Sequence, residues 1–241
     1  MIFIKPLASS KILNVLDTAL CDVISDHLSL DFYPHDLSVL HQYVDKYELN
    51  ALRLKCFEAT NNINWDSLLR DACFSVLSSA LGPDLLIQKK LNLSIHMPGD
   101  DLSTLAAHTD CSSGDSPFEL VLWLPLTNAF DTNSMFICNR VESSRFYEAV
   151  LNGLRHNVDL SNSTYISINR GYFLVFPPTL IHGNSINSTD STRISVNIRV
   201  KSVYSPYSKS LVGDRMFGSY YKEWNITEHH SWNYHVYNIF K

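Results

Sequence analysis

Two neighbouring stretches, Gly171-Tyr-Phe-Leu-Val-Phe-Pro-Pro-Thr-Leu-Ile-His182 and Arg193-Ile-Ser-Val-Asn-Ile-Arg199, decide the fold. Both are rich in the β-branched and aromatic residues that favour strands, and turn-forming residues lie between them. If segments 172–182 and 193–203 pair as a hairpin, His182 lies opposite Arg193 or close to it. The second stretch alternates with period two, which places polar and apolar side chains on opposite faces: Arg193, Ser195, Asn197 and Arg199 on one, and Ile194, Val196, Ile198 and Val200 on the other.

The rest of the chain combines strands with helices. Alternating or β-rich runs predict further strands over residues 87–96, 118–126 and 134–138. Helical spacing of apolar residues predicts helices over 10–22 and 65–81, the second ended by Gly82-Pro83, and a helix over 143–155. This order indicates a mainly β fold with flanking helices, either a sandwich or a barrel with helices packed outside. No repeat or linker is visible, so we expect one domain over residues 1–241.

The predicted strand 87–96 has an unusual polar face. Its even positions are all polar: Gln88, Lys90, Asn92, Ser94 and His96. Antiparallel sheets commonly turn such a face to water, so a solvated edge is the simpler interpretation. The alternative is a strand that lines a polar cavity.

Composition excludes several classes of protein. The 19 Lys and Arg against 24 Asp and Glu leave a formal net charge of −5, which argues against a nucleic-acid partner. No apolar run approaches the ~20 residues that span a bilayer, and the first 20 residues do not resemble a secretory signal. The five cysteines are widely spread without a Cys-x-x-Cys pair, which argues against a disulfide framework or a zinc knuckle. We therefore expect a soluble, cytoplasmic protein with neither a nucleic-acid nor a membrane partner.

Three residues have the chemistry of a metal site. His108-Thr-Asp110 places an imidazole and a carboxylate two residues apart, and His182 ends a predicted strand. Two imidazoles and one carboxylate form the facial triad of non-haem Fe(II) oxygenases. Arg193 is close to the last ligand in this arrangement, and a guanidinium can grip a carboxylate in bidentate fashion without losing its charge. Ser195 can add a hydrogen bond.

The combined pattern resembles a known family. Its motifs are Lys90-Leu-Asn-Leu, His108-Thr-Asp with Gly114-Asp-Ser-Pro117, Val121-Leu-Trp-Leu-Pro-Leu126, Asn133-Ser-Met-Phe-Ile137, His182-Gly-Asn184, and Arg193-x-Ser-x-Asn-x-Arg199 with Tyr204-Ser-Pro-Tyr207. These motifs are similar to those of Fe(II)/2-oxoglutarate-dependent oxygenases with a double-stranded β-helix (jelly-roll, cupin-like) core. More closely, they resemble the phytanoyl-CoA-dioxygenase-like branch often encoded with carbohydrate-biosynthesis genes. The resemblance covers residues 85–215 and leaves a mainly helical flank, 1–84, and an aromatic-rich segment, 216–241.

The resemblance implies a mechanism and a set of site residues. His108, Asp110 and His182 would bind Fe(II), and 2-oxoglutarate would chelate the iron with its C5 carboxylate on Arg193 and Ser195; Arg199 is the competing anchor. Dioxygen would take the remaining position, and oxidative decarboxylation to succinate and CO₂ would drive oxidation of a C–H bond. Asn92 would line the cavity and contact 2-oxoglutarate. The substrate contacts that we expect are Gln88, Lys90, Trp123, Ser134 and Asn184.

The substrate that the resemblance suggests is a small polar metabolite, sugar- or nucleotide-linked, which the enzyme would hydroxylate or otherwise oxidise. Two alternatives stay open at this stage. One is a redox-neutral, metal-dependent, cupin-like isomerase or epimerase, which needs no carboxylate anchor. The other is a non-catalytic glycan-binding β-sandwich, for which three convergent ligands have no use.

Aromatic side chains are concentrated after Gly218. They are Tyr220, Tyr221, Trp224, Trp232, Tyr234, Tyr237 and Phe240, interspersed with His229, His230 and His235. So many aromatic residues cannot all face water. We expect them to pack over the barrel or across a homodimer interface, and the alternative is a segment that covers the substrate.

Overall fold

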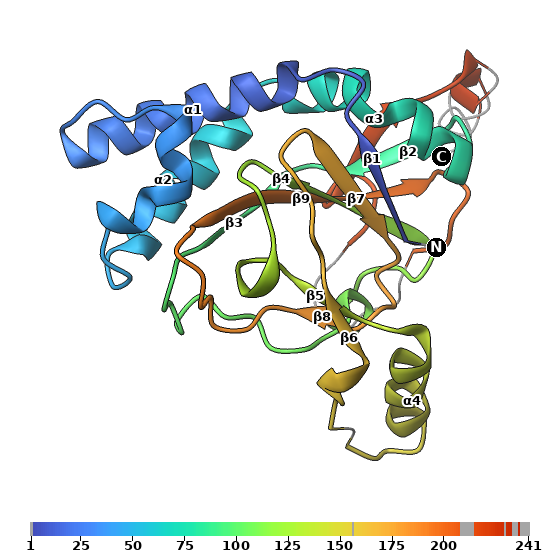
Figure 1. Ribbon diagram of the computed structural model, residues 1–241. Coiled ribbons are helices and arrows are strands. Elements are labelled where there is room, and N and C mark those ends of the chain that lie inside the picture. The colour runs from blue at the N-terminus through green and yellow to red at the C-terminus, as the bar shows by residue number, and fades with distance from the viewer. Residues whose placement is uncertain (1, 156, 208–214, 229, 233–235, 237–241) are drawn as a thin grey trace.

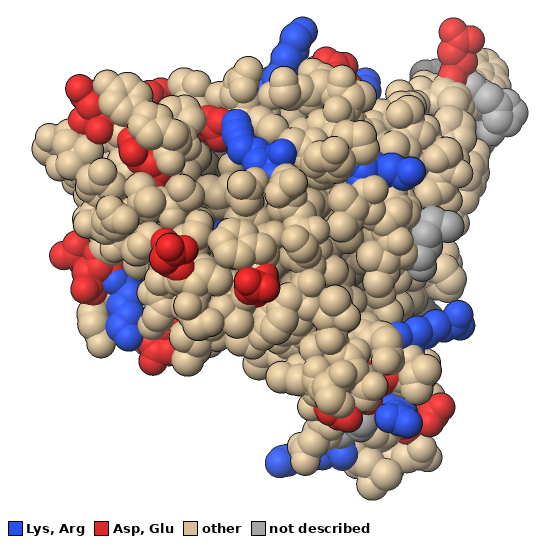
Figure 2. All heavy atoms as spheres, in the orientation of Figure 1, with Lys and Arg blue, Asp and Glu red and all other residues tan. Residues whose placement is uncertain are grey.

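The computed structural model describes residues 2–155, 157–207, 215–228, 230–232 and 236. Ten strands form two sheets within these ranges, and helices cover the larger sheet (Figure 1). No helix in the described ranges is long and apolar enough to cross a membrane. On the face shown in Figure 2, acidic and basic side chains are interspersed and form no large patch of one sign.

The N-terminal part is helical, as predicted. It contains α1 (Lys11–Leu28), the 3-10 helix η1 (Pro34–Gln42), α2 (Leu49–Asn62) and α3 (Trp65–Leu81). The prediction for α3 is confirmed at both ends, and Gly82 ends the helix with a φ of 88°, a conformation that glycine adopts without strain. α1 runs six residues beyond the predicted end at Asp22, because Ile24 continues its buried stripe.

The larger sheet has seven strands. Their order is β1 (Phe3–Pro6), β7 (Tyr172–Phe176), β4 (Glu119–Pro125), β9 (Arg193–Ser202), β2 (Leu85–Gln88) and β10 (Tyr221–Asn225), and β3 (Asn92–His96) also pairs with β9. The smaller sheet has the order β6 (Ser163–Tyr165), β5 (Phe136–Cys138) and β8 (His182–Gly183). All strand pairings in both sheets are antiparallel.

The predicted hairpin between segments 172–182 and 193–203 is wrong. β4 lies between β7 and β9 and pairs with both, while His182 belongs to the smaller sheet and pairs with Ile137 of β5. The residue opposite Arg193 is His96 of β3. The chain therefore changes sheets between Phe176 and His182, at Pro177 and Pro178, and proline cannot donate a hydrogen bond to a continuing ladder.

The predicted alternation along β9 is confirmed. Ile194, Val196, Ile198 and Val200 are buried in the main hydrophobic cluster, which also contains the buried residues of α1, α2 and α3. On the opposite face, Val121 and Trp123 of β4 pack in a second cluster with Ile137 of the smaller sheet. One face of the larger sheet therefore packs on helices, and the other faces the smaller sheet.

The predicted continuous strand 87–96 is broken in two. β2 ends at Gln88 and β3 begins at Asn92, with Lys89 and Lys90 exposed in the connection. Asn61 of α2 holds this connection, since its side chain accepts from the Leu91 amide at 2.8 Å and donates to the Leu91 carbonyl at 3.1 Å. Lys90 is thereby exposed, whereas Gln88 and Asn92, on either side of the break, stay in contact, since the Gln88 amide donates to Oδ1 of Asn92 at 3.4 Å.

Two further predictions differ from the structure. α4 spans Arg140–Leu151 rather than 143–155, because the Asn139 side chain accepts from the Glu142 amide and caps the helix there. The strand β1, which no pattern predicted, pairs with β7 at the edge of the larger sheet. In Figure 1, α4 stands beside the smaller sheet, far from α1 and α2.

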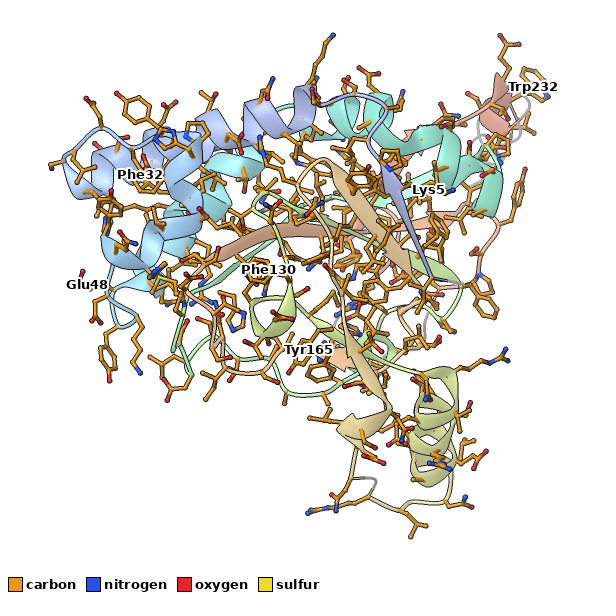
Figure 3. The ribbon with its side chains drawn as sticks, viewed as in Figure 1. Lys5, Phe32, Glu48, Phe130, Tyr165 and Trp232 are labelled. Carbon is orange, nitrogen blue, oxygen red and sulfur yellow. The ribbon has the colours of Figure 1, made fainter. Side chains whose placement is uncertain are left out.

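The C-terminal aromatic residues divide into two groups. Tyr221 and Trp224 of β10 are buried, which agrees with packing onto the core, whereas Trp232 is exposed (Figure 3). Tyr220 and His230 are half-buried, and the remaining residues of the prediction, Tyr234, Tyr237, Phe240, His229 and His235, lie outside the described residues.

Candidate metal centre

A short antiparallel bridge brings His108 and His182 together. Each backbone amide donates to the carbonyl of the other residue at 2.9 Å, and the ring centroids are 4.5 Å apart. Gly183 makes this close approach possible, since a Cβ there would lie 2.7 Å from the Leu105 carbonyl oxygen and 2.9 Å from Cζ of Phe136. The imidazole rings of His108 and His182 are therefore adjacent, although the two residues are 74 positions apart in the sequence.

Both imidazoles have the same hydrogen-bonding pattern. Nδ1 of His108 lies 2.8 Å from the Ala106 carbonyl oxygen, and Nδ1 of His182 lies 2.9 Å from the Leu180 carbonyl oxygen. A carbonyl accepts only, so each Nδ1 carries the proton and each neutral ring keeps its lone pair on Nε2. This arrangement is typical of histidine metal ligands, whose other nitrogen donates to a carbonyl or carboxylate.

Asp110 completes the cluster at the start of the 3-10 helix η2 (Asp110–Ser113). Its amide donates to the Pro178 carbonyl oxygen at 3.0 Å, and the hydroxyl of Thr109 caps the helix. Oδ1 of Asp110 lies 3.6 Å from Nε2 of His108 and 3.5 Å from Nε2 of His182. In the described part of the chain, these three residues form the single group of His, Cys, Asp or Glu side chains close enough to hold one metal ion.

The second oxygen of Asp110 faces a row of charges. Oδ2 lies 2.7 Å from Nη2 of Arg199, whose Nε lies 3.3 Å from Oδ2 of Asp115, and Asp115 pairs in turn with Arg215. Burial would raise the pKa of Asp110, but the two neighbouring histidines and the charge of Arg199 outweigh it and hold that pKa well below its usual range. The carboxylate is therefore ionised and available as a ligand.

The triad opens into a cavity of about 340 Å³. This volume is at the lower end of the range for small-molecule sites. Besides the triad, residues of both sheets and of α2 line it: Arg53, Asn92, Leu93, Ser94, Ser103, Leu105, Val121, Trp123, Met135, Phe176, Gly183, Asn184, Arg193, Asn197 and Arg199.

Arg193 is a buried cation inside this cavity. Its Nε donates to the Asn133 carbonyl oxygen at 2.9 Å, and its Nη1 donates to the hydroxyls of Ser94 at 3.1 Å and Ser195 at 2.5 Å. No described carboxylate lies within 4.0 Å of it, and burial lowers its pKa to about 10. A buried charge without a counter-ion is costly, so this guanidinium is prepared for an anionic ligand.

The other predicted cosubstrate residues, Ser195 and Asn92, lie in different surroundings. Ser195 does not line the cavity; its hydroxyl accepts from both Arg193 and Nε1 of Trp123, the latter at 3.1 Å. Asn92 lines the cavity and donates to Oδ1 of Asn197 at 3.0 Å. Trp123 forms a wall of the cavity, with its ring 5.8 Å from Cζ of Arg193.

The predicted substrate contacts are only partly brought together. Trp123 and Asn184 line the cavity, and Asn184 accepts from the Leu105 amide. Gln88 is buried beside the site, where it accepts from the Arg199 amide at 3.2 Å. Lys90 is exposed in the connection before β3, and Ser134 is fully buried, so neither lines the cavity.

Sequence reasoning missed two arginines of the site. Arg199 was considered only as an alternative anchor, but it pairs with the ligand Asp110. Arg53 of α2 was not considered, since it lies in the helical part that no motif covers, and it lines the cavity. The alternation of β9 did place Arg199 on the correct face, whereas no sequence signal connects Arg53 to the triad.

Comparison with known proteins identifies the fold. The nickel complex of the non-haem monooxygenase ThoJ superposes with a TM-score of 0.58 at 17% identity, covering 95% of this chain and 81% of that one. ThoJ without metal gives a TM-score of 0.55 at 16% identity, covering 94% and 80%. EvdMO1 gives 0.52 at 14% identity, covering 82% of this chain and 46% of that one. No protein-family model and no curated protein matches the sequence. The chain thus shares its fold with solved non-haem oxygenases.

Proposed function

We propose that this protein is an Fe(II)- and 2-oxoglutarate-dependent oxygenase. The observation that carries the proposal is that the His-Asp-His cluster and a buried guanidinium without a counter-ion line one cavity. The fold shared with ThoJ supports it. We further propose a double-stranded β-helix core and membership of the phytanoyl-CoA-dioxygenase-like branch, on the strength of the sequence motifs.

The residues present fit an iron ion. Nε2 of His108, Nε2 of His182 and Oδ1 of Asp110 would hold it, and these donors suit Fe(II) when other coordination positions stay open. Bound iron would activate dioxygen, so that 2-oxoglutarate is converted to succinate and CO₂ while one oxygen atom enters a C–H bond of the substrate. A metal-dependent isomerase would have no use for Arg193.

The protein's own residues position the reactants. Arg193 would bind the C5 carboxylate of 2-oxoglutarate, with the orientation of its guanidinium fixed by Ser94, Ser195 and the Asn133 carbonyl. Asn92, held by Asn197, would offer an amide to the same cosubstrate. Val121, Trp123 and Phe176 form an apolar wall that would exclude water from the reacting atoms.

The substrate that we propose is a small polar metabolite, sugar- or nucleotide-linked, which is hydroxylated or otherwise oxidised. Trp123 would contact it, and so would Asn184 at the end of the cavity near Leu105. The cavity volume of about 340 Å³ suits a small cosubstrate and a compact substrate group.

The test is an assay for 2-oxoglutarate turnover with Fe(II) and dioxygen. Succinate should form, and a panel of sugars and nucleotide sugars should contain compounds that stimulate it. Asp110→Asn should abolish succinate formation, because the amide keeps the size of the carboxylate and loses its charge. Metal binding with no consumption of 2-oxoglutarate under any of these conditions would contradict the proposal.

A further inference from the structure

The cavity extends beyond the edge of the larger sheet. Asn92, Leu93 and Ser94 are consecutive residues of β3, and all three line it. α2 contacts β3, and Arg53 of that helix lines the same cavity, so the cavity reaches the space beside β3 on its α2 side. β3 pairs only with β9 among the described strands, which leaves its other edge open for this extension of the cavity.

Helix α2 borders this extension of the cavity. Asn61 fastens α2 to the chain just before β3 through two hydrogen bonds with Leu91. Arg53 lies two turns earlier on the same helix, is half-buried, and lines the cavity together with Ser103. A cation therefore stands on the α2 side of the cavity, while the triad and Arg193 lie between the sheets.

Arg53 has an incomplete set of partners. Its Nη2 donates to the hydroxyl of Ser103 at 3.3 Å, and its buried Nε has no hydrogen-bond acceptor among the described residues. No described carboxylate lies within 4.0 Å of its guanidinium, whereas the cavity's third arginine, Arg199, is neutralised by Asp110 and Asp115. A cation without a counter-ion that lines a cavity favours the binding of an anionic ligand there.

We propose that Arg53 binds an anionic group, a phosphate or a carboxylate, of the primary substrate. This inference rests on the proposed function, because Arg193 is taken to hold 2-oxoglutarate and leaves Arg53 for the second reactant. The guanidinium would hold two oxygens of the anion through its terminal nitrogens, one of which Ser103 helps to position. The enzyme would then select anionic substrates over neutral ones of the same shape.

The probes are methyl phosphate and acetate, titrated calorimetrically into the anaerobic protein loaded with Fe(II) and 2-oxoglutarate. Arg53→Gln should weaken the tighter of the two probes at least about tenfold, the loss expected for one charge-assisted contact. Arg53→Lys keeps the charge but lacks the paired N–H donors of a guanidinium, so its affinity for the probe should lie between those of Arg53→Gln and the parent. Arg140→Gln makes the same charge change at an exposed position on the distant α4 and should have no effect.

Three results would overturn the assignment. The first is binding of neither probe to the parent protein, and the second is equal binding to the parent and to Arg53→Gln. The third is loss of 2-oxoglutarate binding in Arg53→Gln, which would make Arg53 the cosubstrate anchor. Tighter binding of methyl phosphate would identify a phosphorylated substrate, and tighter binding of acetate a carboxylated one.

Failure of the proposed function would be recognised separately. If the parent protein forms no complex with Fe(II) and 2-oxoglutarate, the oxygenase proposal fails. The calorimetric titration with methyl phosphate and acetate is then repeated on the metal-free Arg193→Gln variant. Probe binding that disappears in the double variant Arg193→Gln/Arg53→Gln would still identify Arg53 as an anion site. Probe binding that survives in the double variant would reject it.

Discussion

Arg199 and Asp110 form an ion pair with 2.7 Å between Nη2 and Oδ2, while Oδ1 of the same carboxylate faces the two imidazoles. The pair comes from the end of β9 and the start of η2, which are 89 positions apart in the sequence. Arg199 therefore fixes the rotation of the carboxylate, so that one oxygen is directed at the metal position and the other is not free to compete for it.

Arg199→Gln should consequently weaken metal binding without removing a ligand. Loss of a residue that orients a metal ligand commonly costs about 10- to 100-fold in metal affinity, and we expect this range here. Anaerobic Fe(II) titration of the variant measures it, with Arg140→Gln on α4 as the charge-matched control. Unchanged affinity in Arg199→Gln would show that the ion pair does not orient Asp110.

Gly183→Ala should destabilise the protein and disturb the site together. The added Cβ would meet the Leu105 carbonyl oxygen and the Phe136 ring at 2.7 and 2.9 Å, so the bridge between His108 and His182 has to open. We expect a loss of about 1–3 kcal/mol in unfolding free energy, the usual cost of overpacking. Urea denaturation measures the loss, and Fe(II) titration should show weaker binding. A variant with the parent's stability and affinity would contradict the close approach.

Glu119 predicts a pH dependence of stability. It is buried opposite Lys201 and accepts from the Tyr221 hydroxyl. Burial raises its pKa from 4.5 to about 7, although Tyr221, Arg199 and Lys201 act in the other direction. Between these two pH values the folded state holds a proton that the unfolded state has released, so this group's contribution to stability falls as pH rises.

Glu119→Gln should remove that dependence. The unfolding free energy of the parent relative to the variant should fall between about pH 4.5 and about pH 7, by no more than about 4 kcal/mol at 1.4 kcal/mol per pKa unit. Urea denaturation of both proteins across this range measures the difference. The glutamine keeps an acceptor for Tyr221, so a difference that stays constant with pH would contradict the raised pKa of Glu119.

Local patterns predicted those parts of the fold that local interactions determine. The 3.6-residue spacing and Gly82 predicted both ends of α3, and the period-two alternation of Arg193 to Val200 separated the face in the main hydrophobic cluster from the face that carries Arg193, Asn197 and Arg199. These features depend on residues near one another in the chain, where side-chain spacing reports directly on burial.

Long-range pairing could not be predicted in the same way. Segments 172–176 and 193–202 look like a hairpin because they are neighbours in the sequence, yet β4 inserts between them. Alternation fixes which face of a strand is buried and does not say which strand lies beside it. The close packing of Gly183 against Leu105 and Phe136, and the position of Arg53 of α2 at the cavity, likewise depend on contacts between distant segments.

The candidate triad was accessible to sequence reasoning because its residue types are chemically distinctive. His108, Asp110 and His182 are brought within ligand distance of one another, as expected. The predicted contacts Gln88, Lys90 and Ser134 were chosen from the polarity of their strands, and the break at Lys89 and the burial of Ser134 place them outside the cavity. Polarity alone does not distinguish a cavity-lining side chain from one that is exposed or hydrogen-bonded within the protein.

The most direct test of the account is an anaerobic titration of the metal-free protein with Fe(II) and then with 2-oxoglutarate, followed by visible absorption. We expect a weak charge-transfer band that needs both components and is lost in Arg193→Ala, because the buried guanidinium is the anchor for the distal carboxylate. Asp110→Asn should lose iron binding itself. Iron binding by the parent protein without that band would contradict the cosubstrate assignment and with it the proposed oxygenase.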